Sequence, residues 1–439
     1  MAQFDTNKQR YNLNNNTLHE TSILTHTDGG AVSDVNPWGK QVLLVDDDTV
    51  QHTSKNRRKV SQNEIIDYAS YAATKATSIW DELVTGTASS THDPFLGMVN
   101  LEVGGTAGDE IVRQTKRVQK YIPGRQNEGS MAVIFGAPTA GICRRFGVYD
   151  ETDGVYFEQE GANLSCVIRR NTVGGVVEDR VVRENWNGDK LDGNGPSGID
   201  LDFTKIQLLM IEYEWYGAGQ VEFNFIINNN KYAVHQFDHA NAVDHSWASR
   251  GQFPVRVEMK NVTGVAGTHS FKQGSHSFST EGRTEVLGRQ KSISTALAGR
   301  PSGSVALEFA PLVAIRLKDD RLSTVVAPAS FTAGAIDNID CFIAIVEGAT
   351  IVGGTWVSPE DDSNIEYNIT GTSYTNGTVT ETLLITKGNG DKIQIGGITQ
   401  LERSTTTALG DTAVTYVLAG ATTPGSKQIF AALDWIEVR

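Results

Sequence analysis

The sequence is poor in cysteine, in long apolar runs and in positive charge, and each shortage excludes a class of protein. Three cysteines, Cys143, Cys166 and Cys341, occur among 439 residues, and this odd, sparse set does not make a disulfide framework. We therefore expect the chain to fold in a reducing cytoplasm. No run of about 18 apolar residues occurs, so we expect no transmembrane helix and no membrane insertion. The first residues, MAQFDTNKQR, place no apolar stretch behind their charges, which predicts no secretory signal.

The charge balance argues against nucleic acid as a partner. The chain has 38 Lys and Arg residues against 52 Asp and Glu residues, a formal net charge of −14, whereas binding to phosphates needs a basic surface. Two basic runs interrupt the acidic background, and each is interpreted as a solvated face or as a docking patch for an acidic neighbour. The first run is Lys55, Arg57, Arg58 and Lys59, and the second is Arg113, Lys116, Arg117 and Lys120.

The first part of the chain predicts an arm followed by a helix. Residues 1–60 are rich in Asn and Thr with little apolar periodicity, which predicts an extended N-terminal docking arm that becomes ordered against another protein. Ser61 and Glu64 form a capping-box pattern, so residues 61–95 are predicted to be a helix and linker. The apolar residues that follow at helical spacing predict a face that packs on the chain's own β domain or on copies of itself about a symmetry axis. The members of this face taken as docking residues are Ile65, Tyr68, Ala72, Ile79 and Trp80.

Beyond residue 96 the apolar pattern changes to a period of two. Turn sequences such as Asp153-Gly154 and Asn228-Asn229-Asn230 separate the segments, which is typical of β-hairpins. Short strands, frequent Gly and Asn turns and few helices predict a mainly β protein built as an antiparallel sandwich. We place a β-sandwich domain at residues 96–299 and a second, C-terminal β domain at residues 300–439.

Glu212 and Glu214 are the strongest catalytic candidates, because positions i and i+2 of a strand share one face. The segment Ile-Glu-Tyr-Glu-Trp-Tyr-Gly resembles part of the acidic motif of sandwich-fold glucanases. The third acid of that motif is missing, since Tyr216 and Gly217 occupy its place. Two carboxylates on neighbouring positions do not supply the nucleophile and acid that flank a scissile bond. We therefore predict no enzyme activity and interpret both residues as the polar face of a strand.

Two polar groups are candidate ligands for a metal ion. His235, His239 and His245 lie in HQFDHANAVDH, but their spacing matches no known zinc motif. The loop NGDKLDGNGPSGIDLD offers oxygen ligands for calcium, although oxygen-rich loops are also simply solvated, and solvation is the favoured interpretation. The candidate residues for a calcium or glycan loop are Asp189, Asp192, Asn194 and Asp200, with Trp247 as a sugar-stacking side chain.

Several stretches resemble a family of structural proteins of tailed bacteriophage particles, notably from marine phages. They are YIPGRQNEGSMAVIF, RRFGVYDETDGVYFEQEG, the NWNGDKLDGNGPSGIDLD loop and IEYEWYGAGQVEFNFIINNNKYAVHQFDHAN. Downstream, FAPLVAIRLKDDR, GGTWVSPEDDSNIEYN and ALDWIEVR are similar to the C-terminal part of the same family. The resemblance covers roughly residues 115–439. It implies a concanavalin-like or jelly-roll β-sandwich and a place in the virion, as a capsid decoration, a fibre or a tail component.

Together these features predict a structural component of a tailed-phage virion, made and assembled in the host cytoplasm. Its expected partners are other capsid or tail proteins, contacted through the N-terminal region, and copies of itself, with a homotrimer favoured. The alternative is a lectin-like adhesin that binds host surface glycans, and a glycan hydrolase is the less favoured third reading.

Overall fold

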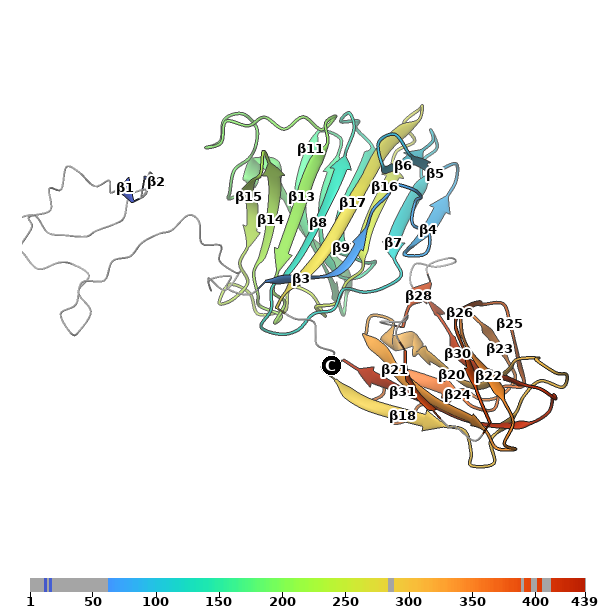
Figure 1. The fold of residues 1–439 in the computed structure, drawn as a ribbon. Helices are drawn as coiled ribbons and strands as arrows, with labels where there is room; N and C mark the ends of the chain where they lie inside the picture. The colour runs from blue at the N-terminus through green and yellow to red at the C-terminus, as the bar shows by residue number, and fades with distance from the viewer. Residues whose placement is uncertain are drawn as a thin grey trace, which may run out of the picture. The chain divides into compact units, whose positions relative to one another are not determined.

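The structure is a computed structural model that describes residues 62–282, 288–387, 391–395, 401–404 and 412–438 (Figure 1). It also describes a short antiparallel pair, β1 (Asn12–Leu13) and β2 (Asn16–Thr17). Residues Met1–Val60 and Ser61–Arg439 form two separate units. The rest of the predicted docking arm, including Lys55, Arg57, Arg58 and Lys59, lies outside the described residues.

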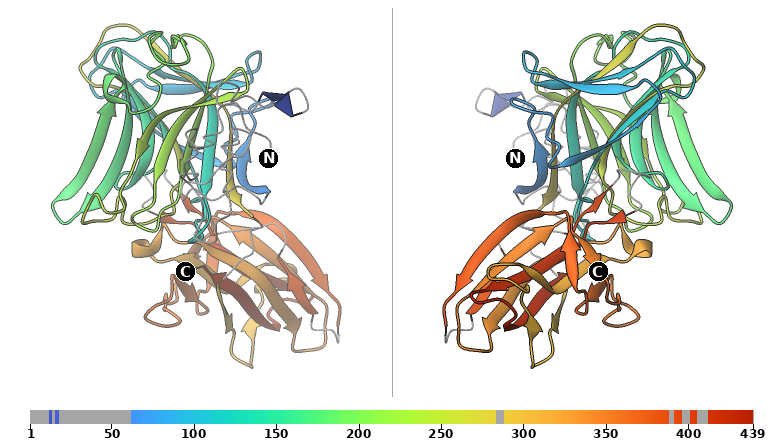
Figure 2. Two further views of the ribbon diagram at one scale, coloured as in Figure 1. Left: turned by 90° about the vertical axis from the view of Figure 1, so that its left-hand side faces the viewer. Right: turned by 90° about the vertical axis from the view of Figure 1, so that its right-hand side faces the viewer.

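The sandwich consists of two large antiparallel sheets that face each other across one core (Figures 1 and 2). The rings of Phe157 from one sheet and Phe223 from the other are 5.0 Å apart, so aromatic side chains fill the space between the layers. The seven-stranded sheet has the order β12 (Gly175–Val182), β11 (Asn163–Thr172), β10 (Gly154–Glu160), β9 (Ile142–Tyr149), β16 (Val255–Asn261), β7 (Glu110–Thr115) and β4 (Trp80–Thr85). The eight-stranded sheet has the order β15 (Asn230–Phe237), β14 (Val221–Ile227), β13 (Gln207–Tyr213), β8 (Asn127–Ile134), β17 (His269–Glu281), β6 (Met98–Val103) and β5 (Ser89–Asp93), and β3 (Asn63–Ala69) pairs with β17.

The C-terminal part forms a second pair of antiparallel sheets around its own core, which includes the fully buried Trp435. One sheet has the order β18 (Arg289–Ser294), β31 (Gln428–Glu437), β21 (Val326–Ala335) and β27 (Asp391–Gln394), with β19 (Arg300–Pro301) also on β31. The other has the order β24 (Ile365–Asn368), β20 (Ala310–Leu317), β30 (Tyr416–Thr422), β22 (Cys341–Glu347) and β26 (Thr378–Ile385). Short pairs join β23 (Thr350–Val352) to β25 (Ser373–Thr375) and β28 (Arg403–Ser404) to β29 (Thr412–Ala413).

The predicted mainly β fold class is confirmed for the described residues, which form an antiparallel sandwich followed by a second pair of antiparallel sheets. The described residues contain no α-helix, and two short 3₁₀ turns are present at Arg183–Asn185 and Asp319–Arg321. No helix in the described part of the chain is long and apolar enough to cross a bilayer. The strands place the sandwich at residues 63–281, and β18 joins the second domain before residue 300.

The predicted helix in residues 61–95 is wrong, because these residues form the strands β3, β4 and β5. The misleading signal has a physical cause in β3. Tyr68 faces Ser277 and Ile65 faces Ser279, and a bulge inserts one extra residue between them. The bulge puts residues three apart on one face of a strand, which imitates the spacing of a helix. Ala76, with a φ of 55°, lies in the loop before β4.

Candidate functional site

The outer face of the seven-stranded sheet carries a dense set of charged side chains. Along β9, Phe146 and Val148 point into the core, so Arg145 and Tyr149 point outward. The strand register places Glu158 of β10 on one side of Arg145 and Glu258 of β16 on the other. We call the outward set the Arg–Glu–Tyr network, and it consists of Arg145, Arg169, Arg180, Arg256, Glu158, Glu178, Glu258, Tyr149 and Tyr156.

Arg145 lies at the centre of this network and joins two carboxylates. Its Nε donates to Glu158 Oε2 and its Nη1 donates to Glu258 Oε1, both at 2.7 Å. Arg256 donates to Glu258 at 3.1 Å and to Glu151 at 2.7 Å. Such charge-assisted contacts between directly opposed strands fix the side chains as well as the sheet register.

The network continues to the strand at the edge of the sheet. Arg180 of β12 donates to Glu158 at 2.7 Å and to Glu178 at 2.8 Å. Arg169 of β11 donates to Glu178 at 2.8 Å, and the hydroxyl of Tyr156 donates to the same carboxylate at 2.7 Å. One chain of ion pairs therefore runs across β16, β9, β10, β11 and β12.

Two tyrosine rings lie within this layer of charge. Tyr149 and Tyr156 are fully buried, with ring centroids 4.4 Å apart. The guanidinium of Arg169 lies 5.4 Å from the Tyr149 centroid and 5.1 Å from the Tyr156 centroid. Cation–π contacts of this kind allow arginines to be packed as well as paired.

Burial and charge together determine the protonation of the network. Burial acts to raise the pKa of Glu258, but Arg256 and Arg145 outweigh it and lower the pKa to about 2. Burial also opposes ionisation of Glu178, whereas hydrogen bonds from Tyr156 and Arg169 lower its pKa to about 2. A general acid in glycoside hydrolysis needs a raised pKa, so neither residue suits that role. Glu158 and Glu258 are 1% and 4% exposed, which leaves their carboxylates little access to a ligand.

Sequence reasoning missed this network, although a signal for it is present. The pairs Glu178/Arg180 and Arg256/Glu258 each place opposite charges two residues apart on a strand. Recognising them needed the pairing of β9 with β16, which joins residues more than 100 positions apart in sequence.

Glu212 and Glu214 do not form a catalytic pair on an open face. Glu212 is 2% exposed, accepts a hydrogen bond from Gln126 Nε2 at 2.6 Å and contacts the Lys231 ammonium group. Lys231 also lies 2.6 Å from Glu222. Glu214 lies beyond the end of β13 and is fully buried. The arrangement agrees with a structural role for both carboxylates.

In the candidate calcium loop, several side-chain oxygens accept hydrogen bonds from backbone N–H groups of the same loop. The carboxylate of Asp189 accepts hydrogen bonds from the backbone N–H groups of Leu191 at 2.9 Å and Ser197 at 2.8 Å. Asp192 accepts one from the Asn194 backbone at 3.0 Å, and the Asp200 side chain is 79% exposed. Among the described residues, no group of three or more His, Cys, Asp or Glu side chains is arranged to hold a metal ion.

The predicted sugar-stacking role of Trp247 is wrong because its ring is buried. The side chain is 2% exposed and packs against Tyr213 and Phe253, at centroid distances of 5.9 and 6.0 Å. His239 stacks on the Trp247 ring at a centroid distance of 6.0 Å and contacts the Gly219 carbonyl through Nδ1 at 2.7 Å. Burial lowers the pKa of His239, which favours the neutral ring.

The predicted docking residues separate into exposed and buried ones. Ile65 and Tyr68 are 61% and 69% exposed on β3, and Ala72 is exposed in the following loop. Ile79 is partly buried against the core, and Trp80 is 1% exposed within it, so the prediction for Trp80 is wrong. In the second basic run, Arg113 is fully buried and donates to Glu82 at 2.8 Å, so it is not part of a solvated face.

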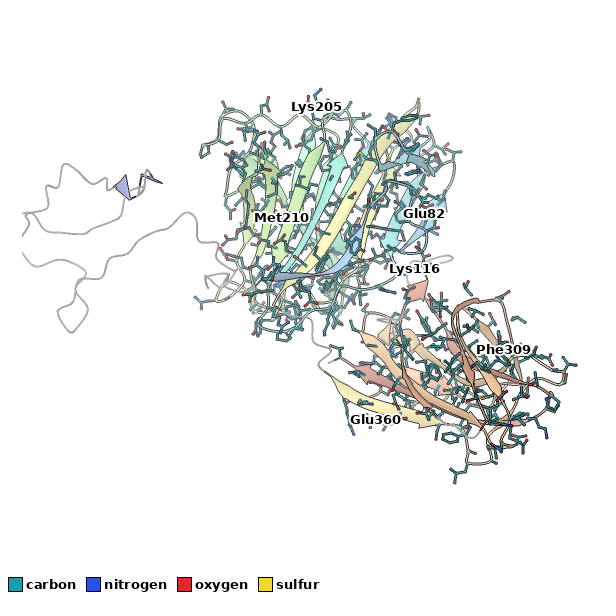
Figure 3. All side chains as sticks on the ribbon, viewed as in Figure 1. Glu82, Lys116, Lys205, Met210, Phe309 and Glu360 are labelled. Carbon is teal, nitrogen blue, oxygen red and sulfur yellow. The ribbon has the colours of Figure 1, made fainter. Side chains whose placement is uncertain are left out.

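The outer face of the eight-stranded sheet has a different chemistry from the network. Its central row runs from Tyr68 through Ser277 and Ser130 to Met210, and the two serine hydroxyls are 2.9 Å apart. Leu208, which is 40% exposed, forms the next row. We call the central part of this surface the uncharged face (Met210 is labelled in Figure 3), and it consists of Tyr68, Ser277, Ser130, Met210, Ala132, Leu208 and Ile226. Glu212, Glu222 and Lys231 lie beside it on the same side of the sheet and form ion pairs with one another.

No protein-family model matches the sequence, and no curated protein is similar to it. Solved structures with a similar fold include a β-glucanase of Bacillus licheniformis, at 10% identity over 51% of this chain and 100% of the other, with a TM-score of 0.32. A legume lectin-like domain from Entamoeba histolytica matches at 11% identity over 45% of this chain and 89% of the other, with a TM-score of 0.27. The CBM2 module of the evolved Dit of Lactobacillus casei BL23 phage J-1 matches at 8% identity over 51% of this chain and 99% of the other, with a TM-score of 0.35. These similarities carry no functional conclusion.

Proposed function

We propose that this protein is a non-catalytic structural component of a tailed-phage virion, which docks onto other capsid or tail proteins and displays its two β domains. The observation that carries the proposal is the contrast between the two outer faces of the sandwich. The outer face of the seven-stranded sheet is closed by its own ion pairs. The other outer face presents exposed Tyr68 and Leu208 beside Ser130, Ser277 and Ala132, with charged side chains grouped at Lys231. Surfaces that expose apolar and aromatic side chains with few charges between them are typical of protein interaction sites.

The family resemblance supports the same proposal. The stretch RRFGVYDETDGVYFEQEG forms the β9–β10 hairpin, and YIPGRQNEGSMAVIF includes β8 at the centre of the opposite sheet. The first stretch supplies Arg145, Tyr149, Tyr156 and Glu158 to the network. The resembling residues therefore build the central strands of both sheets of the sandwich.

The partner class remains as the sequence predicts: other virion proteins, with the N-terminal region as an additional contact. The homotrimer was expected from a helix in residues 61–95. Ile65 and Tyr68 lie on a strand instead, so that argument for a homotrimer no longer applies. Glycan binding loses its named aromatic residue, because Trp247 is buried. We therefore favour protein docking over glycan recognition.

The proposal is tested by incorporation of a charged variant into particles. Tyr68→Glu combined with Leu208→Glu puts two unpaired carboxylates on the uncharged face, where both native side chains are exposed and folding is not expected to suffer. We expect mass spectrometry of purified particles to find the wild-type chain and to miss the double variant. Val305→Glu, at a valine 62% exposed in the second domain, is the matched control and should be incorporated normally. Incorporation of the double variant at wild-type level, or absence of the wild-type chain from particles, contradicts the proposal.

A further inference from the structure

The free edge of the seven-stranded sheet is rich in valine. β12 lies at the end of this sheet, and β11 is its one strand partner in the described part of the chain. Val176 and Val177 are 47% and 42% exposed, and Val173 at the hairpin tip is fully exposed. An edge with exposed β-branched residues and unused backbone hydrogen-bonding groups is a template for another strand.

We propose that β12 pairs antiparallel with β12 of a second copy of this chain, about a twofold axis through Asp179. In this register Glu178 faces Arg180 of the second copy, and Arg180 faces its Glu178. Val177 faces Val181 and Val176 faces Val182, so valine meets valine at four places. Opposite charges and β-branched pairs placed directly across an antiparallel ladder are the favourable combinations.

Neighbouring registers are worse on the same criteria. Each register has one like-charge pair at its axis, which is Asp179 against Asp179 in the proposed one. An axis through Glu178 places two glutamates opposite each other and, in addition, puts Val177 against Asp179. An axis through Arg180 places two arginines opposite each other and again pairs valines with carboxylates. A shift by one residue makes the two core faces point in opposite directions, because side chains alternate along a strand. The edge sequence therefore selects one symmetric register.

The existing ion pairs extend naturally across this axis. Glu178 and Arg180 are the network members at the edge, with side chains 23% and 35% exposed, whereas Glu158 and Glu258 are buried. In the paired edge, the Glu178 and Arg180 side chains of one copy face Arg180 and Glu178 of the other. The second copy therefore extends the row of ion pairs and covers these two partly exposed side chains. The β11–β12 segment, residues 163–183, carries four arginines against two acids in a chain of net charge −14. Its local positive charge offsets the repulsion between two acidic molecules.

Sedimentation velocity of the full chain over a concentration series tests the pairing. We expect a concentration-dependent dimer that Val176→Lys with Val177→Lys abolishes, because four lysines then lie at the joint. Val305→Lys with Val357→Lys is the control, since these valines are 62% and 44% exposed away from β12. A wild-type chain that stays monomeric up to its solubility limit, or a dimer that the β12 variant leaves intact, overturns the proposal.

Asp179 provides a readout of the register itself. Across an antiparallel pair the two Cα atoms at the axis lie about 4.5–5.5 Å apart, within the range that a disulfide spans. Asp179→Cys should therefore cross-link under mild oxidation, whereas Val173→Cys at the hairpin tip should not, and the three native cysteines are buried. Asp179→Asn removes the one like-charge pair of the joint and should tighten the dimer by roughly two- to five-fold. Equal cross-linking of the two cysteine variants contradicts the register.

This inference goes beyond the proposed function and does not depend on it. If the wild-type chain dimerises and the Val176/Val177 variant is still incorporated into particles at the normal level, the docking proposal is unaffected. Loss of incorporation in the Tyr68/Leu208 variant with an unchanged dimer leaves the β12 pairing untouched.

Discussion

Arg145 Nη1 lies 2.7 Å from Glu258 Oε1, and the two residues stand directly opposite each other on β9 and β16. This contact joins strands that are far apart in sequence, and it is made on the outer side of the sheet rather than in the core. A sheet face that is closed by its own charged side chains needs no partner protein to cover it. The opposite sheet carries a smaller charged group on its outer side, the ion pairs of Lys231 with Glu212 and Glu222, and its Tyr68 and Leu208 stay exposed, which is why the two faces are expected to behave differently.

The first prediction concerns the centre of the network. Arg145→Ala leaves Glu158 and Glu258 buried without their shared guanidinium. Removing one partner of a buried ion pair costs about 3–5 kcal/mol, so we expect a loss of that size in the free energy of unfolding of the sandwich. Chemical denaturation followed by circular dichroism measures it. Arg289→Ala is the control: its side chain is 65% exposed and 3.5 Å from Glu360, and surface pairs contribute about 0–1 kcal/mol. Similar losses in the two variants would refute the buried network.

The second prediction is a loss of stability in acid. The pKa of Glu178 and that of Glu258 are each about 2 in the folded chain, below the unfolded value of about 4.3. Their contribution is therefore fully present above about pH 5 and is lost as the pH falls toward 2, because the unfolded chain binds the proton first. We expect the free energy of unfolding to decline through this window. In Glu178→Gln the decline should be shallower, and an identical pH profile for the two proteins would count against the assigned ion pairs.

The success of the fold prediction rests on local signals that need no tertiary context. The turn between β14 and β15 contains Asn228 and Asn229 at φ values of 53° and 63°, the left-handed backbone that asparagine tolerates. The alternation of apolar and polar residues along β8 and β13 likewise predicted strands with one buried face. The helix was predicted wrongly because a bulge between Ile65 and Tyr68 gives helical spacing to a strand. Trp247 was assigned to a sugar site because sequence does not reveal which aromatic side chains fill the core.

The third prediction is that the chain releases no sugar from polysaccharides. Glu212 is paired with Lys231 and Glu214 is fully buried, so neither carboxylate is placed to flank a glycosidic bond. A reducing-sugar assay with β-glucan and with host capsular polysaccharide should give the same background for the wild type, for Glu212→Gln and for Glu214→Gln. Release by the wild type that either variant abolishes would reinstate these residues as catalytic acids.

The fourth prediction concerns calcium. The Asp189 carboxylate already accepts two backbone hydrogen bonds within its loop, and those contacts hold the loop without an ion. We expect the melting temperature to be the same in calcium and in a chelator, since an ion that binds the folded chain alone would raise it. Asp189→Ala should lower stability by about 1 kcal/mol through the lost loop hydrogen bonds, with or without calcium. A calcium-dependent rise that Asp189→Ala removes would instead establish a cation site.

The fifth prediction concerns Gly147, which faces Tyr156 across the β9–β10 pair. A Cβ added at Gly147 would lie 2.1 Å from the Val155 carbonyl oxygen and 2.5 Å from the Tyr156 Cα. Both obstacles are backbone atoms of the next strand, so relief requires the strands to separate, which would also disturb the contact between the tilted rings of Tyr149 and Tyr156. We expect Gly147→Ala to cost about 3 kcal/mol, the upper end of overpacking penalties, and to change the near-ultraviolet circular dichroism of the tyrosines.

A second glycine provides the control for this change. At Gly174 in the β11–β12 turn, the nearest obstacle to a Cβ is the Thr172 hydroxyl at 3.7 Å, an ordinary contact. Gly174→Ala should therefore alter stability by less than about 1 kcal/mol, because it changes chain entropy without a clash. Equal effects in the two alanine variants would mean that the strands at Gly147 can move apart cheaply. In that case the close approach of β9 to β10 would not be what holds the outward tyrosines and arginines together.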